Sequence, residues 1–215
     1  MSFEMITAVT AETINNLSPD VGILLKNFDL SGATDAETLM AKIRAEDTLT
    51  NCWLGATKGG IAVSENRTFW SASFDGKRMP YVGDKYVDTT EPKISGTFVE
   101  IRPENVHLSS GAADVTTNGH VTTVQPHASI KRGDYVDKIT WITALGQDGL
   151  YVVEMKNALS VTGLSSQSTD KDILTLPFEF TGHQDSVVFD NNLPIKYLFY
   201  RSSGAAAASG EETGY

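Results

Sequence analysis

The sequence has very little cysteine and no long hydrophobic run. Its one cysteine, Cys52, cannot form a disulfide within the chain, which is consistent with a reducing compartment. No apolar stretch approaches the roughly 20 residues that a bilayer-spanning helix needs. The first residues also lack the basic and apolar segments of a secretory signal. We therefore expect a soluble protein that is made and used without export or membrane insertion.

The sequence also lacks the common signals of catalysis. No serine lies in a Gly-x-Ser-x-Gly elbow, and one cysteine cannot build a thiolate zinc site. In the run 55–60, Lys58 precedes the glycine pair instead of following it, so we interpret the run as a tight turn and not as a phosphate loop. No histidine has metal-binding spacing to another; the four are His107, His120, His127 and His183. We predict no catalytic residue, no metal site and no cofactor, and therefore a protein that is not an enzyme.

Basic residues are scarce. The chain has 17 Lys and Arg against 27 Asp and Glu, a net charge of -10. A protein that grips duplex DNA usually shows the opposite balance, because it must neutralise phosphates. An acidic surface keeps a protein soluble, and it also repels nucleic acid. Composition alone leaves both interpretations open.

Strand patterns dominate the rest of the sequence. Alternating apolar residues, aromatic runs and turn residues predict strands over 21–28, 61–63, 67–74, 93–101, 135–145, 150–161, 174–181 and 195–200. Thr34 and Glu37 form a capping-box pattern that predicts a helix to about Ala45. Pro103 opens a second short helix that Gly111 ends. The fold class is therefore mainly β: a β-sandwich or partly open barrel with one or two short flanking helices.

The chain divides into three parts. Residues 1–19 are polar, end at a Ser-Pro pair and are typical of a flexible arm or an edge strand. Residues 20–201 show no internal repeat and no break in composition, so they form one β-domain. Residues 202–215 are rich in Ala, Gly and Ser and are too poor in bulky apolar residues to order themselves, so we expect a disordered tail.

Several stretches, in their order along about residues 20–200, resemble the major tail protein, or tail tube protein, of long-tailed siphophages and phage-tail-like particles. They are Val21–Phe28; Leu54–Val63 with the aromatic strand and Asp75-Gly76 that follow; Lys93–Ile101 leading into Pro103–Asn105; Asp134-Tyr135 with Ile139–Trp141; and Leu174–His183. The helix within 32–46 and the Ala-rich tail depart from the family's pattern.

The resemblance implies a fold and a role. Proteins of this family are β-sandwich or barrel domains, also known from the type VI secretion tube, whose sheets join in hexameric rings that stack into a hollow tube. The chain would be a virion protein, present in the host cytoplasm during assembly, that guides DNA into the host without binding it specifically. Its partners would be copies of itself, a tape-measure protein, and tail terminator and distal tail proteins. An acidic lumen, with strand carboxylates pointing inward, would let DNA slide.

The stretch Lys77–Thr90 resembles the family's long loop, which contacts neighbouring subunits. The resemblance implies an inter-subunit clamp here, and a loop folded onto its own domain is the other interpretation. The candidate residues of the clamp are Met79, Tyr81, Val82, Asp84, Lys85 and Tyr86.

Two other functions remain as alternatives. The first is a non-catalytic β-sandwich module of a phage particle that binds a carbohydrate or a receptor, which would show exposed aromatic residues around a groove. Trp53, Trp70 and Trp141 lie within strand patterns that are more typical of a core. The second alternative, a hydrolase on a β fold, has no set of catalytic residues to support it.

Overall fold

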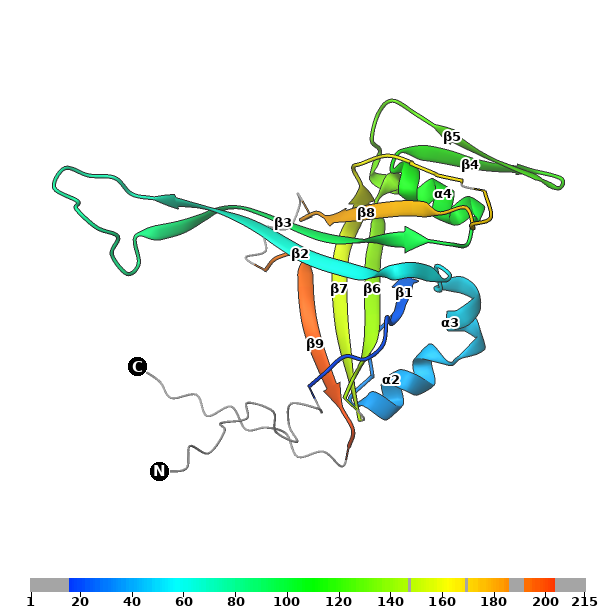
Figure 1. Cartoon of the computed structure of the whole chain (residues 1–215), viewed down its shortest axis with the longest axis horizontal. Helices are drawn as coiled ribbons and strands as arrows, with labels where there is room; N and C mark the ends of the chain where they lie inside the picture. Colours follow the sequence, from blue (N-terminus) through cyan, green and yellow to red (C-terminus); the bar gives the residue numbers. More distant parts are fainter. Residues whose placement is uncertain (1–15, 147, 169, 186–191, 204–215) are drawn as a thin grey trace.

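The computed structural model describes residues 16–146, 148–168, 170–185 and 192–203, and within them the fold is mainly β with antiparallel strand pairing (Figure 1). The N-terminal segment up to residue 15, predicted as flexible, and the Ala-rich tail from 204 lie outside the described residues. Residues 16–19 do contact the domain: the Leu17 carbonyl accepts a hydrogen bond from the Gly146 amide, and Ser18 Oγ lies 3.0 Å from Thr143 Oγ1.

Within the described residues, nine strands form two sheets. The large sheet contains β1 (Ile23–Lys26), β2 (Thr57–Ser71), β3 (Lys85–Phe98), β6 (Val136–Leu145), β7 (Gly149–Ser160), β8 (Leu176–Gly182) and β9 (Ile195–Arg201); β4 (Ala113–Asn118) and β5 (Val121–Pro126) form a separate hairpin. In the large sheet the order is β1-β6-β7-β8-β3-β2, and β9 also pairs with β7. The strands predicted from alternation are confirmed with shifted ends, except that the predicted strands 61–63 and 67–74 are parts of one continuous strand, β2.

The long strand β7 divides the large sheet into two layers. Its first half pairs with β9, whereas only its last residues, Ala158–Ser160, pair with β8. The sheet therefore folds over, so that β8, β3 and β2 pack across β1, β6, β7 and β9. This arrangement is consistent with the predicted β-sandwich. The backbone of Cys52–Leu54 also bonds to β1, and this segment leads directly into β2.

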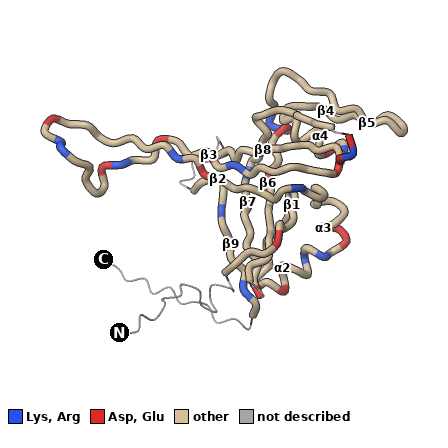
Figure 2. Tube along the Cα trace, viewed as in Figure 1, with Lys and Arg blue, Asp and Glu red and all other residues tan. Residues whose placement is uncertain are grey.

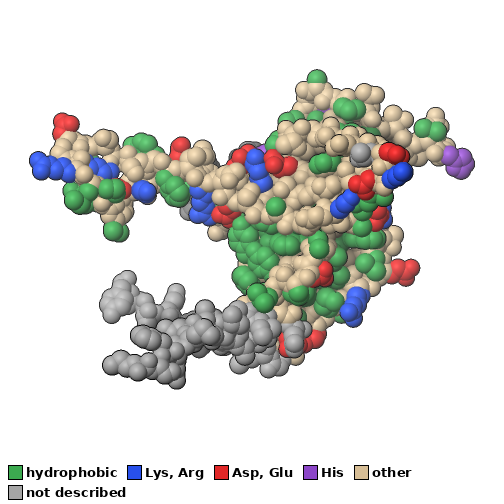
Figure 3. Space-filling view, in the orientation of Figure 1, with side chains coloured by type: hydrophobic (Ala, Val, Ile, Leu, Met, Phe, Trp, Pro, Cys, Tyr) green, Lys and Arg blue, Asp and Glu red, His purple; other side chains and the backbone are tan. Residues whose placement is uncertain are grey.

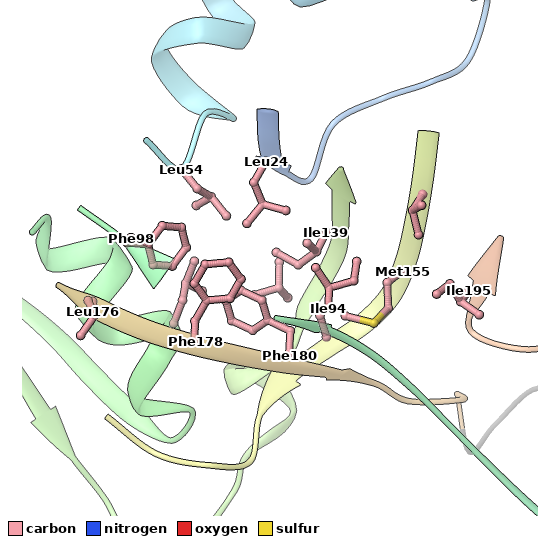
Figure 4. Close-up of a cluster of buried hydrophobic side chains, with 14 residues drawn as sticks. Leu24, Leu54, Ile94, Phe98, Ile139, Met155, Leu176, Phe178, Phe180 and Ile195 are labelled. Carbon is pink, nitrogen blue, oxygen red and sulfur yellow. The ribbon is translucent and has the colours of Figure 1, made fainter. Parts of the chain in front are cut away.

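One hydrophobic core fills the space between the layers. Ile139 from β6, Met155 from β7 and Phe178 from β8 point toward one another there (Figure 4). The Phe98 and Phe178 rings stack at 4.1 Å. Pro177 lies opposite Thr97 of β3, on a stretch of β8 that β7 does not pair, so its missing amide proton interrupts no ladder on that side.

Three α-helices flank the sheet. Helix α2 (Ala36–Ile43) covers the outer face of β7 and β9 with Leu39 and Ile43. The predicted capping box is shifted by one residue: Asp35 caps the helix, and Thr38, not Glu37, completes the box. Helix α3 (Glu46–Asn51) was not predicted. Helix α4 (Pro103–Ser110) begins at proline and ends at Gly111, as predicted.

Strands β2 and β3 form one long hairpin that projects from the domain (Figure 1). Two predictions need correction here. Residues 57–60 do not form a turn between strands; they begin β2, with a register shift between Thr57 and Ile61. Residues 85–90 are not loop but part of β3, so the loop itself runs only from 72 to 84.

None of the helices in the described ranges has the length and hydrophobicity that crossing a bilayer requires.

Candidate assembly surfaces

The distal part of the β2–β3 hairpin, residues 66–89, forms an arm that the domain does not cover. At the base of the arm, the Glu65 carboxylate accepts a hydrogen bond from the Tyr197 hydroxyl of β9 at 2.9 Å. Beyond this point the side chains of both strands, 66–71 and 85–89, are exposed. The arm is therefore not folded back onto its own domain.

The arm is apolar on both of its faces. Directly paired residues of antiparallel strands share a face. Trp70 pairs with Tyr86, and their rings lie 5.6 Å apart on one face. Phe69 pairs with Val87 on the other face. All four side chains are more than half exposed. An exposed apolar surface of this kind typically marks an interaction site.

Polar contacts close the tip of the arm. Lys77 Nζ lies 2.5 Å from a carboxylate oxygen of Asp84 and donates a hydrogen bond to the Ala72 carbonyl. The Asp84 carboxylate also accepts from the Tyr81 amide at 3.0 Å. The hydrogen bond from Lys77 is the main cause that lowers the pKa of Asp84 below its ordinary value. Asp84, a predicted contact residue, therefore holds the tip together from within.

The other predicted clamp residues lie on the outside of the arm. Met79, Tyr81 and Val82 are exposed in the loop, Val82 completely so. Lys85 and Tyr86 begin β3. Sequence reasoning missed Phe69 and Trp70, because it treated the aromatic run before the Asp-Gly turn as part of the body. Val87 lies in the predicted clamp stretch but was not among its candidate residues.

We expect Asp84→Asn to open the tip at neutral pH. Trypsin should then cut after Lys77 and Arg78 severalfold faster than in the unchanged protein, because proteolysis follows the open population. In the unchanged protein the depressed pKa means that the carboxylate's contribution is present at neutral pH and is lost only as the pH falls through that lowered value. Asp75→Asn is the control, and equal cleavage rates for both variants would refute the role of Asp84.

A second apolar surface lies on the body, and we call it the aromatic patch: Trp141 of β6, Tyr151 of β7, and Tyr197 and Phe199 of β9. Tyr197 and Phe199 are exposed, whereas Trp141 and Tyr151 are partly buried against the core. The register aligns Thr143, Tyr151 and Phe199 in one row and Trp141, Val153 and Tyr197 in the next, so these side chains share one face of the sheet. Hydrophobic side chains gather over this part of the body, on the side from which the arm projects (Figure 3).

The patch rings pack against one another. Tyr151 meets the Trp141 ring edge-on at 5.9 Å and lies 5.0 Å from the Phe199 ring. The Trp141 indole donates to the Val21 carbonyl at 2.9 Å, so its polar atom is satisfied. Burial raises the pKa of Tyr151, and burial followed by the hydrogen bond to Glu65 raises that of Tyr197. Both phenols therefore stay neutral at physiological pH.

The exposure of the tryptophans corrects a sequence-based interpretation. None of the three is buried: Trp70 is 58% exposed on the arm, and Trp53 and Trp141 are partly exposed. The layer of β8, β3 and β2, which covers the inner face of β6 and β7, does not extend over the patch. A strand pattern with large aromatics therefore did not distinguish core from surface.

Two sheet edges accompany these surfaces. Among the described strands, β2 pairs only with β3, and β9 pairs only with β7. The outer edges of the arm strand and of the strand beside the patch thus lack a strand partner within this part of the chain. Unpaired edges of this kind are templates for strand addition by another chain.

The described residues offer little for chemistry. No group of three or more His, Cys, Asp or Glu in these ranges is placed to hold a metal ion. A hollow of about 930 Å³ beside β9 is lined by mixed charges, including Lys138, Lys156 and His183. Another of about 610 Å³, near Gly59 and Gly60, is lined mainly by small residues.

The charge distribution bears on the expected acidic lumen. The named strands contain seven acidic and nine basic residues, so the acidic surplus of the sequence lies outside these strands. Figure 2 shows both signs of charge along the described strands. The strand composition gives no support to an acidic lumen wall, and the direction in which strand carboxylates face in an assembly stays a prediction.

Comparison with known proteins adds no family to this description. No protein-family model matches the chain, and no curated protein matches it.

Proposed function

We propose that this chain is a structural subunit that assembles with copies of itself into stacked hexameric rings, the hollow tail tube of a phage or phage-tail-like particle. The observation that carries the proposal is the arm, which extends from an antiparallel β-domain and is apolar on both faces. The order of sequence motifs that resembles the tail tube family supplies the kind of assembly.

An isolated molecule leaves much of this surface in water. Phe69 and Trp70 of the arm and Phe199 of the patch each expose more than half of their surface. Contacts between unlike surfaces of identical copies can close into a ring or extend into a filament. Copies that contact one another in this way would bury their exposed apolar surfaces and also pair the open edges of β2 and β9.

In this function the chain performs no reaction and holds no cofactor. Its work is geometric: the tube guides DNA from the particle into the host without specific contacts. Its partners are copies of itself, a tape-measure protein, and terminator and distal tail proteins at the two ends. The protein acts in the virion tail after assembly in the host cytoplasm.

Electron microscopy of the concentrated protein tests the proposal. We expect rings or tubes in negative stain, together with sedimentation that becomes faster as the concentration rises. Dispersed particles and an unchanged monomer mass over the whole accessible concentration range, with and without a crowding agent, would contradict it.

A carbohydrate- or receptor-binding module is the second candidate, and the exposed aromatic patch favours it. Sugar rings stack on exposed aromatic faces, and the Phe199 ring is accessible. The patch rings, however, contact one another and form a continuous apolar surface, which suits a protein partner better than a polar glycan. Binding of the monomer to a glycan array, lost in Phe199→Ser, would favour this second function.

A further inference from the structure

We propose that the aromatic patch is the acceptor for the arm of a second copy of this chain. The inference rests on the proposed self-assembly and deepens it, because it names the surface that receives the arm. Both surfaces are built from described residues, and the two differ, so one copy carries one arm and one acceptor.

The arm does not cover the patch of its own chain. The hydrogen bond between Tyr197 and Glu65 fixes the hairpin to β9 at the point where it leaves the body. From there the paired strands extend away from the body (Figure 1), and the residues on both are exposed. Six strand residues, 66–71, span about 20 Å before the tip begins. The ladder keeps this segment extended, so another molecule must supply the acceptor.

The two surfaces match in chemistry. The arm presents Trp70 and Tyr86 on one face, and the patch presents Tyr151, Tyr197 and Phe199. Aromatic side chains bury large areas and gain further from edge-on and offset contacts between rings. Two polar groups of the patch are already bonded within their own chain: the Trp141 indole to the Val21 carbonyl and the Tyr197 hydroxyl to Glu65, so covering the rings leaves neither of these two without a partner.

The charges of the two parts are complementary. Residues 66–89, the arm, contain four basic and three acidic side chains, whereas the rest of the chain contains 13 basic and 24 acidic ones. An arm with a basic excess is attracted to the acidic body of a second copy and adds orientation to the apolar contact.

The backbone edges add a third match. The outer edge of β2 in the arm and the outer edge of β9 beside the patch both lack a strand partner among the described residues. An arm lying across the patch brings these two edges within reach of each other. Main-chain hydrogen bonds between them would give the contact affinity and register.

A contact of this kind joins unlike surfaces and is therefore directional. Each copy that donates its arm still offers its own patch, so growth continues from copy to copy. This property allows a test with two variants that are each defective in one surface: Trp70→Ser in the arm and Phe199→Ser in the patch. Both residues are mostly exposed, so both variants should fold.

Sedimentation of the two variants, alone and mixed, provides the test. Truncating an aromatic anchor should weaken association about 30-fold or more, so each variant alone should remain monomeric where the unchanged protein assembles. An equimolar mixture should form a dimer and nothing larger. The intact arm of the Phe199→Ser variant binds the intact patch of the Trp70→Ser variant, and the two surfaces that remain in this dimer are both defective. The control is Val121→Ser, equally exposed on β5, which should assemble normally.

The other outcomes separate the two proposals. If the unchanged protein assembles and Phe199→Ser assembles equally well, the patch is not the acceptor, but the tube function stands. If both variants stay monomeric and their mixture gives no dimer, the arm and the patch do not form one contact, and the inference is wrong. If the unchanged protein never assembles, the proposed function itself fails.

Discussion

A protein in which residues 69–88 are replaced by Asn-Gly is expected to fold normally and to lose the ability to assemble. Thr68 and Thr89 are directly paired, so a two-residue turn can join them in a short hairpin. The removed side chains contact one another and the base of the arm, not the core. The free energy of unfolding should therefore change by less than about 1 kcal/mol, whereas assembly should weaken at least roughly 100-fold.

The shortened protein should also limit the assembly of the unchanged protein. It keeps its aromatic patch and can accept one arm, but it has no arm to pass on. Small amounts added to the unchanged protein should therefore shorten the tubes seen by electron microscopy. A shortened protein that assembles by itself, or one that is unfolded by circular dichroism and urea denaturation, would contradict this view of the arm.

Asn105→Leu is expected to destabilise the fold strongly. Asn105 is completely buried in α4, and its amide donates to the carbonyls of Leu54 and Glu100 at 2.8 and 2.9 Å. Leucine fills a similar volume but removes both hydrogen bonds. The Leu54 carbonyl then loses its donor, whereas the Glu100 carbonyl keeps the Arg102 amide at 3.2 Å. A buried carbonyl without a donor costs about 1–3 kcal/mol and a lost hydrogen bond about 1 kcal/mol, so the free energy of unfolding should fall by about 2–4 kcal/mol.

Urea denaturation measures this loss, with Asn66→Leu as the matched control. Asn66 is exposed on the arm, so the same substitution there should change stability by no more than about 0.5 kcal/mol. If the two variants lose equal stability, Asn105 does not join α4 to the chain segments at Leu54 and Glu100.

Local patterns revealed the regular parts of this fold. The alternation in 174–181 predicted a half-buried strand, and Phe178 and Phe180 of β8 are buried as it required. Pro103 and Gly111 marked both ends of α4 because each has a conformation suited to that end: Gly111 has a positive φ of 79°, and an added Cβ would lie 2.2 Å from the Ser160 carbonyl oxygen.

Other features depended on contacts between distant segments. The hairpin of β4 and β5 was missed although Asn118-Gly119 is a strong turn signal, because its threonine-rich strands have no apolar face that alternates. The patch could not be foreseen, since it exists only where β8 and β3 stop covering β6, β7 and β9. The sequence alone does not show that Lys77 and Asp84 form an ion pair, because the folded tip brings them together. Asp84 was therefore predicted as a contact residue although it stabilises the tip.

Cross-linking of mixed isotopes tests the central claim most directly. Equal amounts of unlabelled and ¹⁵N-labelled protein are assembled together and treated with a lysine cross-linker, and peptides joining Lys85 of the arm to Lys196 of β9 are identified by mass. If arms dock onto other copies, about half of these linked peptides should pair a light with a heavy chain, by random mixing. Links confined to chains of one isotope would place the arm on its own domain and contradict the account.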